Sequence, residues 1–249
     1  MSWNPINETT IITPFYNTRP EYFLGYLTSL AKFPDVPIII GNDGSDKQHT
    51  DMLHNMVQKY PNITVIDFKE NIGMCGTLYK LIKAAAANGS KYVLKCDSDD
   101  GIHHFPEFSS EDNSDDYDAL IVKNCKLNAE HFLATKGNGP GGSLYKTEVY
   151  LELYRDWSFM DRNEKWIHED VWMHLNLTML DFKIEHDQSQ DPTKIYEYKY
   201  ARPGSMTAGK QLDKRSPKCE TFLLWARYHN MRPQLYHKIQ REINQLRSK

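Results

Sequence analysis

A chain of 249 residues is long enough for one large domain, or for one domain with an extension. Its 40% hydrophobic and 25% charged residues are typical of a globular protein, and no stretch approaches the roughly 18 apolar residues of a membrane helix. The four cysteines form no CxxC pair, which predicts neither a zinc site nor a disulfide framework. The start of the chain has no signal pattern, so we expect a cytoplasmic protein. Two narrower cases are a cytoplasmic protein that is peripheral to a membrane and a viral protein in a host cytoplasm.

The net charge of −3 hides an uneven distribution of charge along the chain. Residues 208–249 contain ten Lys or Arg and three Asp or Glu, a balance of +7, which leaves −10 for residues 1–207. We therefore divide the chain into a domain at 1–207 and a basic helical extension at 208–249. The extension indicates an anionic partner, either nucleic acid or an anionic surface, or else a solvated basic helix face.

Strands and helices alternate through the first 100 residues. Apolar or β-branched runs predict strands at 9–13, 37–40, 63–66 and 92–94, and apolar residues at helical spacing predict helices at 21–33, 50–60 and 77–87. This alternation predicts an α/β fold with a parallel sheet and right-handed crossovers. Later in the chain we expect a strand at 119–122, a glycine-rich loop at 137–142, helices at 148–154 and 171–179, and a strand at 195–200.

Three carboxylic acids follow the fourth predicted strand: Asp97, Asp99 and Asp100. Ligands of open α/β sheets bind outside the carboxyl ends of the strands. Carboxylates gathered there repel one another unless a cation lies between them, and oxygen ligands suit Mg²⁺ or Mn²⁺. The stretch therefore predicts a metal that meets a phosphorylated ligand; the alternative is a solvated acidic turn.

Four short motifs follow one another along the chain, each at the end of a predicted strand or at the start of a predicted helix. They are Pro14–Asn17 after the first strand, Asn42–Ser45 after the second, Asp97–Asp100 after the fourth, and His168–Asp170 at the start of a late helix. In this order they resemble glycosyltransferase family 2, over about residues 9–207. The resemblance implies the GT-A fold, a Rossmann-like and mostly parallel sheet flanked by helices, together with a nucleotide-diphospho-sugar donor and Mn²⁺ or Mg²⁺.

The resemblance also implies roles for residues around the donor. Thr13, Pro14 and Tyr16 would line the pocket for base and ribose, and Asp43 would accept a hydrogen bond from the imide of a uracil-like base. Asn42 stands where the family usually has a further acid, and the alternative for Asp43 is a turn-forming Asp before glycine. Asn71 and Arg202 match positions near the donor diphosphate, and Gly141–Gly142 matches a glycine pair before the acceptor site.

The metal and the catalytic base are implied in the same way. Asp97 would face the ribose or the metal, and Asp99 and Asp100 the metal and the donor sugar. Asp170 matches the base that deprotonates the acceptor hydroxyl, with Glu169 beside it; helix capping by these two acids is the alternative. His103 and His104 could bring one imidazole to the metal, but we favour a solvated pair.

The favoured function is a metal-dependent, inverting transfer of sugar from a UDP-sugar to a hydroxyl of a glycan or another polymer. A viral-type enzyme that glycosylates a hydroxylated DNA base would explain the basic extension. A nucleotidyltransferase is disfavoured because the loop at 14–20 has no glycine. A non-catalytic sugar-nucleotide binder is hard to reconcile with two intact acid clusters.

Overall fold

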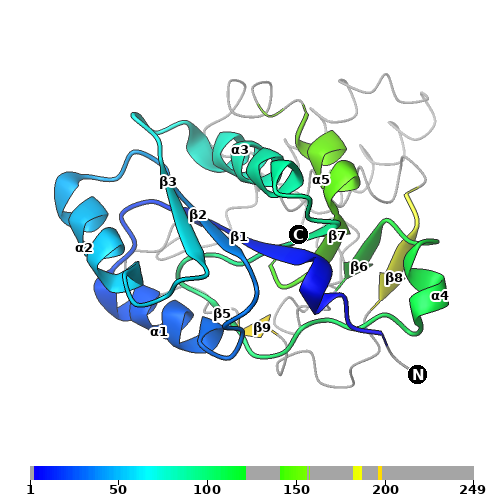
Figure 1. Cartoon of the computed structure of the whole chain (residues 1–249). Helices are drawn as coiled ribbons and strands as arrows, with labels where there is room; N and C mark the ends of the chain where they lie inside the picture. The colour runs from blue at the N-terminus through cyan, green and yellow to red at the C-terminus, as the bar shows by residue number, and fades with distance from the viewer. Residues whose placement is uncertain (1–2, 122–140, 156, 158–181, 187–195, 198–249) are drawn as a thin grey trace, which may run out of the picture.

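The computed structural model describes residues 3–121, 141–155, 157, 182–186 and 196–197. In this part of the chain seven strands form a central sheet in the order β3-β2-β1-β4-β7-β6-β8 (Figure 1). Their bounds are β1 Thr9–Phe15, β2 Ile38–Asn42, β3 Ile63–Asp67, β4 Tyr92–Lys95, β6 Ala119–Ile121, β7 Leu144–Lys146 and β8 Ile184–His186. A separate two-stranded ribbon pairs β5 (Gly101–Ile102) with β9 (Tyr196–Glu197).

The strand directions confirm the mostly parallel sheet. β1 pairs in parallel with β2 and with β4, and β2 pairs in parallel with β3. β7 is antiparallel to both of its neighbours, β4 and β6, while β6 and β8 are parallel. The first four strands therefore point their carboxyl ends to the same edge of the sheet, which is the edge where open α/β sheets bind ligands.

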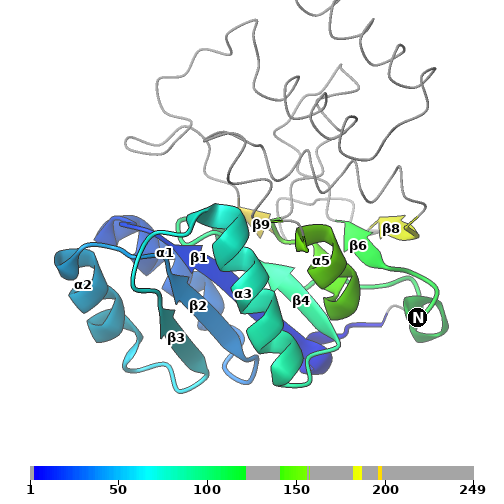
Figure 2. The ribbon, with the colours of Figure 1, turned by 90° about the horizontal axis from the view of Figure 1, so that it is seen from above.

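Helices cover both faces of this sheet (Figure 2). α3 (Gly73–Ala87) and α5 (Thr147–Tyr154) lie on one face, and α1 (Pro20–Leu30) and α2 (Lys47–Val57) on the other. A 3₁₀ turn at Ile6–Glu8 precedes β1, and the short α4 (Glu111–Ser114) precedes β6. The sequence favours these arrangements locally; Pro20, for example, occupies the first turn of α1, where its missing N–H costs nothing.

The core explains why β1 consists of β-branched and apolar residues. All seven of its residues are buried, as expected for a central parallel strand that is covered on both faces. On the α1 side, Phe15 meets Phe23 edge to face at a centroid distance of 5.1 Å, and Phe23 stacks on Tyr26 at 5.5 Å. Burial of large aromatic side chains provides much of the stabilisation that holds α1 under the sheet.

Most predicted elements of the described chain are confirmed, with shifts at their ends. α3 begins at Gly73, whereas the sequence predicts a loop up to Gly76 and a helix from Thr77. β6 and α5 confirm the strand at 119–122 and the helix at 148–154, and β9 lies within the strand predicted at 195–200. β5, β7 and β8 were not predicted, because each is a run of only two or three residues.

Some predictions fall on residues that the structure does not describe. The helix at 171–179, the first part of the glycine-rich loop and the basic extension at 208–249 lie outside the described residues. Among the residues that are described, no helix combines the length and the apolar character needed to cross a bilayer.

Candidate active site

Four loops meet at the carboxyl edge of the parallel strands. The register places Phe15 of β1 beside Asn42 of β2, and Asn42 beside Asp67 of β3, while Ile12 of β1 lies beside Lys95 of β4. The loops that leave these strands therefore start at neighbouring positions. Three of the four motifs that the sequence singles out lie in these loops.

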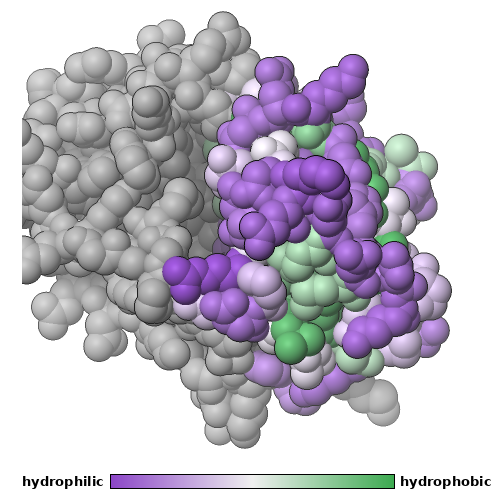
Figure 3. Space-filling model, turned by 90° about the vertical axis from the view of Figure 1, so that its left-hand side faces the viewer, coloured by the Kyte–Doolittle hydropathy of each residue, from purple (hydrophilic) through white to green (hydrophobic). Residues whose placement is uncertain are grey.

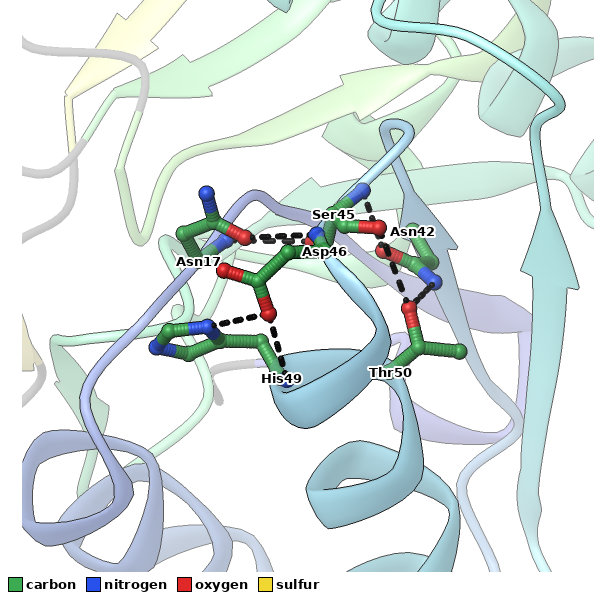
Figure 4. A network of polar contacts seen from close by, with 6 residues as sticks. All are labelled: Asn17, Asn42, Ser45, Asp46, His49 and Thr50. Carbon is green, nitrogen blue, oxygen red and sulfur yellow. Dashed lines mark hydrogen bonds and ion pairs between the residues drawn. The ribbon is translucent and has the colours of Figure 1, made fainter.

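The loop after β1 is tied to the loop after β2. The backbone N–H of Asn17 donates to the Ser45 hydroxyl at 3.1 Å, and the backbone N–H of Asp46 donates to the Asn17 side-chain oxygen at 3.0 Å (Figure 4). Asn17 has a φ of 47°, a left-handed conformation that Asn tolerates better than most residues. Asn17, with its left-handed backbone, is therefore the residue that links the two loops.

A buried amide joins β2, α2 and β3. The Asn42 side-chain nitrogen donates to the Thr50 hydroxyl at 3.1 Å, and its oxygen accepts from the Ser45 backbone N–H at 3.3 Å (Figure 4). The same nitrogen donates to a carboxylate oxygen of Asp67 at 2.8 Å. The other oxygen of Asp67 lies 2.9 Å from His54 of α2. The position where the family usually has an acid is thus a structural amide in this protein.

Asp43 joins the loop after β2 to the start of α3. The backbone N–H of Ile72 donates to one oxygen of its carboxylate at 2.7 Å, and that of Gly73 donates to the other at 3.1 Å. An acid at a helix N-terminus satisfies orphan amides and favourably meets the helix dipole. This explains why α3 begins earlier than expected. Asp43 is 4% exposed, and each of its carboxylate oxygens keeps a second lone pair.

The acidic loop is held to the loop after β1 and to the chain before β7. The hydroxyls of Thr18 and Ser98 are 2.6 Å apart, and the backbone N–H of Gly142 donates to the Lys95 carbonyl at 2.9 Å. Gly141 forms an isolated bridge with Lys95. The predicted glycine pair therefore lies at the end of β4, next to the acidic loop.

The three acids of this loop differ in their exposure. Asp100 is 2% exposed, whereas the side chain of Asp97 is 26% exposed and Asp99 is half-buried. Burial raises the pKa of the Cys96 thiol well above its usual value, and the negative charges of Asp100, Asp97 and Asp99 raise this pKa further. The negative potential of the acids thus reaches into the core beneath the loop.

The residues predicted to line a nucleotide pocket do not all face the same way. Tyr16 is 54% exposed at the end of β1, and Asn71 is exposed with its side-chain oxygen 3.1 Å from the Gly73 backbone nitrogen. Thr13 is fully buried, and its hydroxyl pairs with the Tyr26 hydroxyl of α1 at 2.6 Å. Pro14 is also buried. The structure thus supplies an exposed aromatic face at this loop through Tyr16, while Thr13 serves the packing of α1.

Three of the predicted site residues fall beyond the described ranges. Asp170 and Glu169, predicted as the catalytic base and its neighbour, and Arg202, predicted near the diphosphate, lie outside the described residues. Their roles stay predictions.

The carboxylate oxygens of the acidic loop are ligands that suit a hard divalent ion such as Mn²⁺. Oδ1 of Asp97 is buried and, within the described chain, accepts no hydrogen bond of good geometry, although the Lys95 ammonium is 3.1 Å away. The same part of the chain holds no group of three His, Cys, Asp or Glu side chains arranged around one point, His103 and His104 included. An ion bound by one or two carboxylates and completed by phosphate oxygens and water needs no such group. Asp97 and Asp99 are partly exposed and fit that arrangement, whereas Asp100 is buried.

Three residues of this site were not singled out from sequence. Asn17 and Thr18 stand in the loop at 14–20, of which only Pro14 and Tyr16 were singled out, and Lys95 follows the strand predicted at 92–94. A charged residue inside an apolar strand that ends in acids is a readable signal, because an unpaired lysine is almost never buried.

A hollow also lies away from the strand ends. His54, Val57, Gln58, Tyr60, Pro61, Ile63 and Val65 line it between α2 and β3. Figure 3 views this side of the molecule, where hydrophilic side chains surround a smaller apolar area. The hollow contains none of the strand-end acids, so we do not assign the chemistry to it.

Comparison with known proteins agrees with this geometry. Residues 10–107, which contain β1 from its second residue, β2 to β5 and their loops, match the sequence profile described as Glycosyl transferase family 2. No curated protein matches the sequence.

Solved structures resemble this chain in fold over most of its length. S. aureus TarS 1–349 in complex with UDP-GlcNAc is 19% identical, with a TM-score of 0.58 over 93% of this chain and 70% of that one. The mannosyltransferase PcManGT of Pyrobaculum calidifontis, in complex with GDP-Man and Mn²⁺, is 12% identical, with a TM-score of 0.62 over 95% and 69%. GalNAc-T7 with UDP, GalNAc and Mn²⁺ is 12% identical, with a TM-score of 0.52 over 92% and 49%. The chain therefore contains a glycosyl transferase family 2 domain of the GT-A fold, and it is a glycosyltransferase.

Proposed function

We propose that this protein transfers a sugar from a nucleotide-diphospho-sugar, with a UDP-sugar favoured, to a hydroxyl of a glycan or another polymer, with inversion and with a divalent metal. The observation that carries the proposal is the joining of four strand-end loops through Asn17–Ser45, Thr18–Ser98 and Asp43–Ile72. These bonds bring an exposed aromatic ring, a carboxylate at a helix N-terminus and an acidic loop to one edge of the sheet.

Each part of that edge suits one part of the donor. The exposed face of Tyr16 suits a base, which gains about 1–3 kcal/mol by stacking on an aromatic ring. The second lone pairs of the Asp43 carboxylate suit an imide N–H, which uracil offers and cytosine lacks. The N-terminus of α3 follows at once and favours negative charge near Gly73.

Asp97 and Asp99 would hold the metal with the donor diphosphate. When bound, such an ion neutralises the charge that develops on the diphosphate leaving group. Asp170 is proposed as the base that takes the proton of the acceptor hydroxyl as that oxygen attacks the anomeric carbon, with Glu169 as its neighbour and Arg202 as a phosphate contact.

A thermal-shift screen of UDP- and GDP-sugars with and without Mn²⁺ tests the donor assignment. Saturation at about 100 times Kd stabilises the fold by about 2.7 kcal/mol, which raises Tm by about 5–10 °C for a chain of this size. We expect that rise with a UDP-sugar and Mn²⁺, and its loss in Asp99→Ala. Asp116→Ala, which removes an exposed acid outside the acidic loop, is the matched control. Failure of every nucleotide sugar to shift Tm would refute the proposal.

Asp170→Asn separates binding from turnover. We expect this variant to keep the donor-induced rise in Tm and to lose turnover by 100-fold or more, the usual contribution of a general base. An unchanged kcat would refute the assignment of Asp170. NMR of the anomeric proton of the product shows whether the transfer inverts the configuration. Parallel assays with a glycan acceptor and with DNA that carries a hydroxylated base show which polymer is the acceptor.

A further inference from the structure

A buried lysine lies directly beneath the acidic loop. Lys95 is the last residue of β4 and is 2% exposed, which makes it one of the largest fully buried side chains of the described chain. Its ammonium is 3.1 Å from Oδ1 of Asp97. Burial of a lysine costs several kcal/mol unless a charge and hydrogen bonds compensate for the lost water, so this cation needs its anionic partners.

The pair is held from both sides by the backbone. The Lys95 carbonyl accepts from the Gly142 backbone N–H at 2.9 Å, and the Asp97 carbonyl accepts from the Asp100 backbone N–H at 3.0 Å. The first bond anchors the end of the strand, and the second closes the turn that carries the acids. Neither residue can therefore shift far without opening β4 or the turn.

The two side chains differ in their access to solvent. The Lys95 side chain is 2% exposed, whereas that of Asp97 is 26% exposed. The ammonium thus lies against the buried Oδ1 of the carboxylate, while the Asp97 side chain as a whole keeps part of its surface exposed. The contact fixes the direction of Asp97, and the positive charge offsets part of the repulsion among three neighbouring acids.

We infer that Lys95 is a positioning residue for the donor site: its ammonium orients the Asp97 carboxylate and places a fixed positive charge beneath the position of the nucleotide diphosphate. The inference rests on the proposed function, because it assigns Asp97 to the donor. Lys95 acts through Asp97 and touches no reacting atom.

A double-mutant cycle tests this dependence. The variants are Lys95→Gln, Asp97→Asn and the pair, each titrated calorimetrically with UDP and with GDP at saturating Mn²⁺, and each checked for folding by Tm and circular dichroism. We expect Lys95→Gln to weaken binding of the diphosphate threefold to tenfold in the native background and less than twofold in the Asp97→Asn background, because the two residues act together.

Two further variants separate charge from packing. Lys95→Arg keeps the positive charge, so it should bind the diphosphate better than Lys95→Gln at an equal or lower Tm. Lys91→Gln is the matched control, since Lys91 precedes the same strand, is partly exposed and pairs with Asp115 at 2.9 Å, away from the acidic loop. Its diphosphate affinity should stay within twofold of the native value.

The outcomes distinguish this inference from the proposed function. If the native protein binds neither diphosphate, the proposed function fails and the inference fails with it. If the native protein binds but folded Lys95→Gln binds equally well, or if the effects of Lys95→Gln and Asp97→Asn simply add, only the role of Lys95 is overturned. Should Lys95→Gln fail to fold, Lys95→Arg decides: a folded Lys95→Arg variant that binds within threefold of the native protein supports the role of the charge, and a folded variant that does not bind overturns it.

Discussion

The Asn42 amide donates a hydrogen bond of 2.8 Å to the Asp67 carboxylate and so joins the carboxyl ends of β2 and β3. Asn42 is 2% exposed, and the same amide nitrogen also donates to Thr50 of α2. A neutral hydrogen-bond donor is favourable at position 42, because its neighbour on β3 is the acid Asp67. The amide at this family position is therefore matched to Asp67 and to the packing of α2.

Asn42→Asp should destabilise the fold by about 2 kcal/mol at pH 8, because two carboxylates would meet where a hydrogen bond now lies. Mutual repulsion raises the pKa of the introduced carboxyl above its value in the unfolded chain, so the loss should be smaller at pH 5 and should grow as the pH rises. Urea unfolding at the two pH values measures this difference.

The exchange Asn42→Asp with Asp67→Asn is the control for that prediction. It restores one donor opposite one acceptor and should recover part of the lost stability at pH 8. An exchange variant no more stable than Asn42→Asp alone would show that the repulsion is not the cause.

Gly44→Ala should destabilise the fold by about 2 kcal/mol or more and weaken nucleotide binding. Gly44 has a φ of +65°, and a Cβ there would lie 2.5 Å from the Asn71 backbone nitrogen, which displaces the loop that leads into α3. Chemical unfolding and diphosphate titration measure the two effects.

Gly89→Ala is the matched control for Gly44→Ala. Its φ is +80°, but a Cβ there would meet nothing within 4 Å. It should cost only the backbone strain of about 1–2 kcal/mol and leave nucleotide binding unchanged. Equal effects of the two variants on binding would contradict the proposed contact between loops.

Asp46→Asn should show how much the negative charge of Asp46 at the start of α2 stabilises the fold. The backbone N–H of His49, and then its imidazole, donate to the Asp46 carboxylate and lower its pKa. A lowered pKa means that the stabilisation is present above the unfolded pKa of about 3.9 and is lost as the pH falls through the folded value.

The measurement is the difference in Tm between the native protein and Asp46→Asn from pH 7 to pH 3. Asn still caps a helix, so the difference reports the charge. It should favour the native protein at neutral pH and shrink below pH 4. Asp51→Asn, which removes an exposed acid that pairs with Lys47 on the same helix, is the control. A difference that does not change with pH would refute this account.

Ser98→Ala should weaken diphosphate binding more than it weakens the fold. Loss of the hydrogen bond to Thr18 costs about 1 kcal/mol of stability, and it frees the acidic loop from the loop after β1. We expect threefold to tenfold weaker binding of UDP with Mn²⁺ by calorimetry. Thr28→Ala removes a hydroxyl that bonds only to the Leu24 carbonyl of its own helix in the described chain, and it should leave binding intact.

Local pattern alone predicted the framework of the N-terminal half. Apolar runs such as Ile38–Ile40 have few alternatives to a buried strand, and Pro20 marks a helix start without any tertiary context. The acids at 97–100 could be assigned to a strand end, and to one edge of the sheet, because parallel strands separated by helices end on the same side.

Other features depended on partners far away in the sequence. The early start of α3 requires Asp43, some 30 residues before it, and the sheet-edge position of Gly141–Gly142 requires Lys95. The exposure of Tyr16 beside the burial of Thr13 follows from where α1 packs. The direction of β7 could not be predicted either, since a three-residue strand takes its direction from its neighbours.

The sequence by itself determined which residue types stand at the ends of the strands, because hydrophobic period and turn residues are local properties. Only the tertiary structure decided which of those side chains remain open to a ligand and which, like Thr13 and Asp100, are enclosed by the fold. The physical reason is that exposure and pairing depend on packing between segments that the chain order keeps apart.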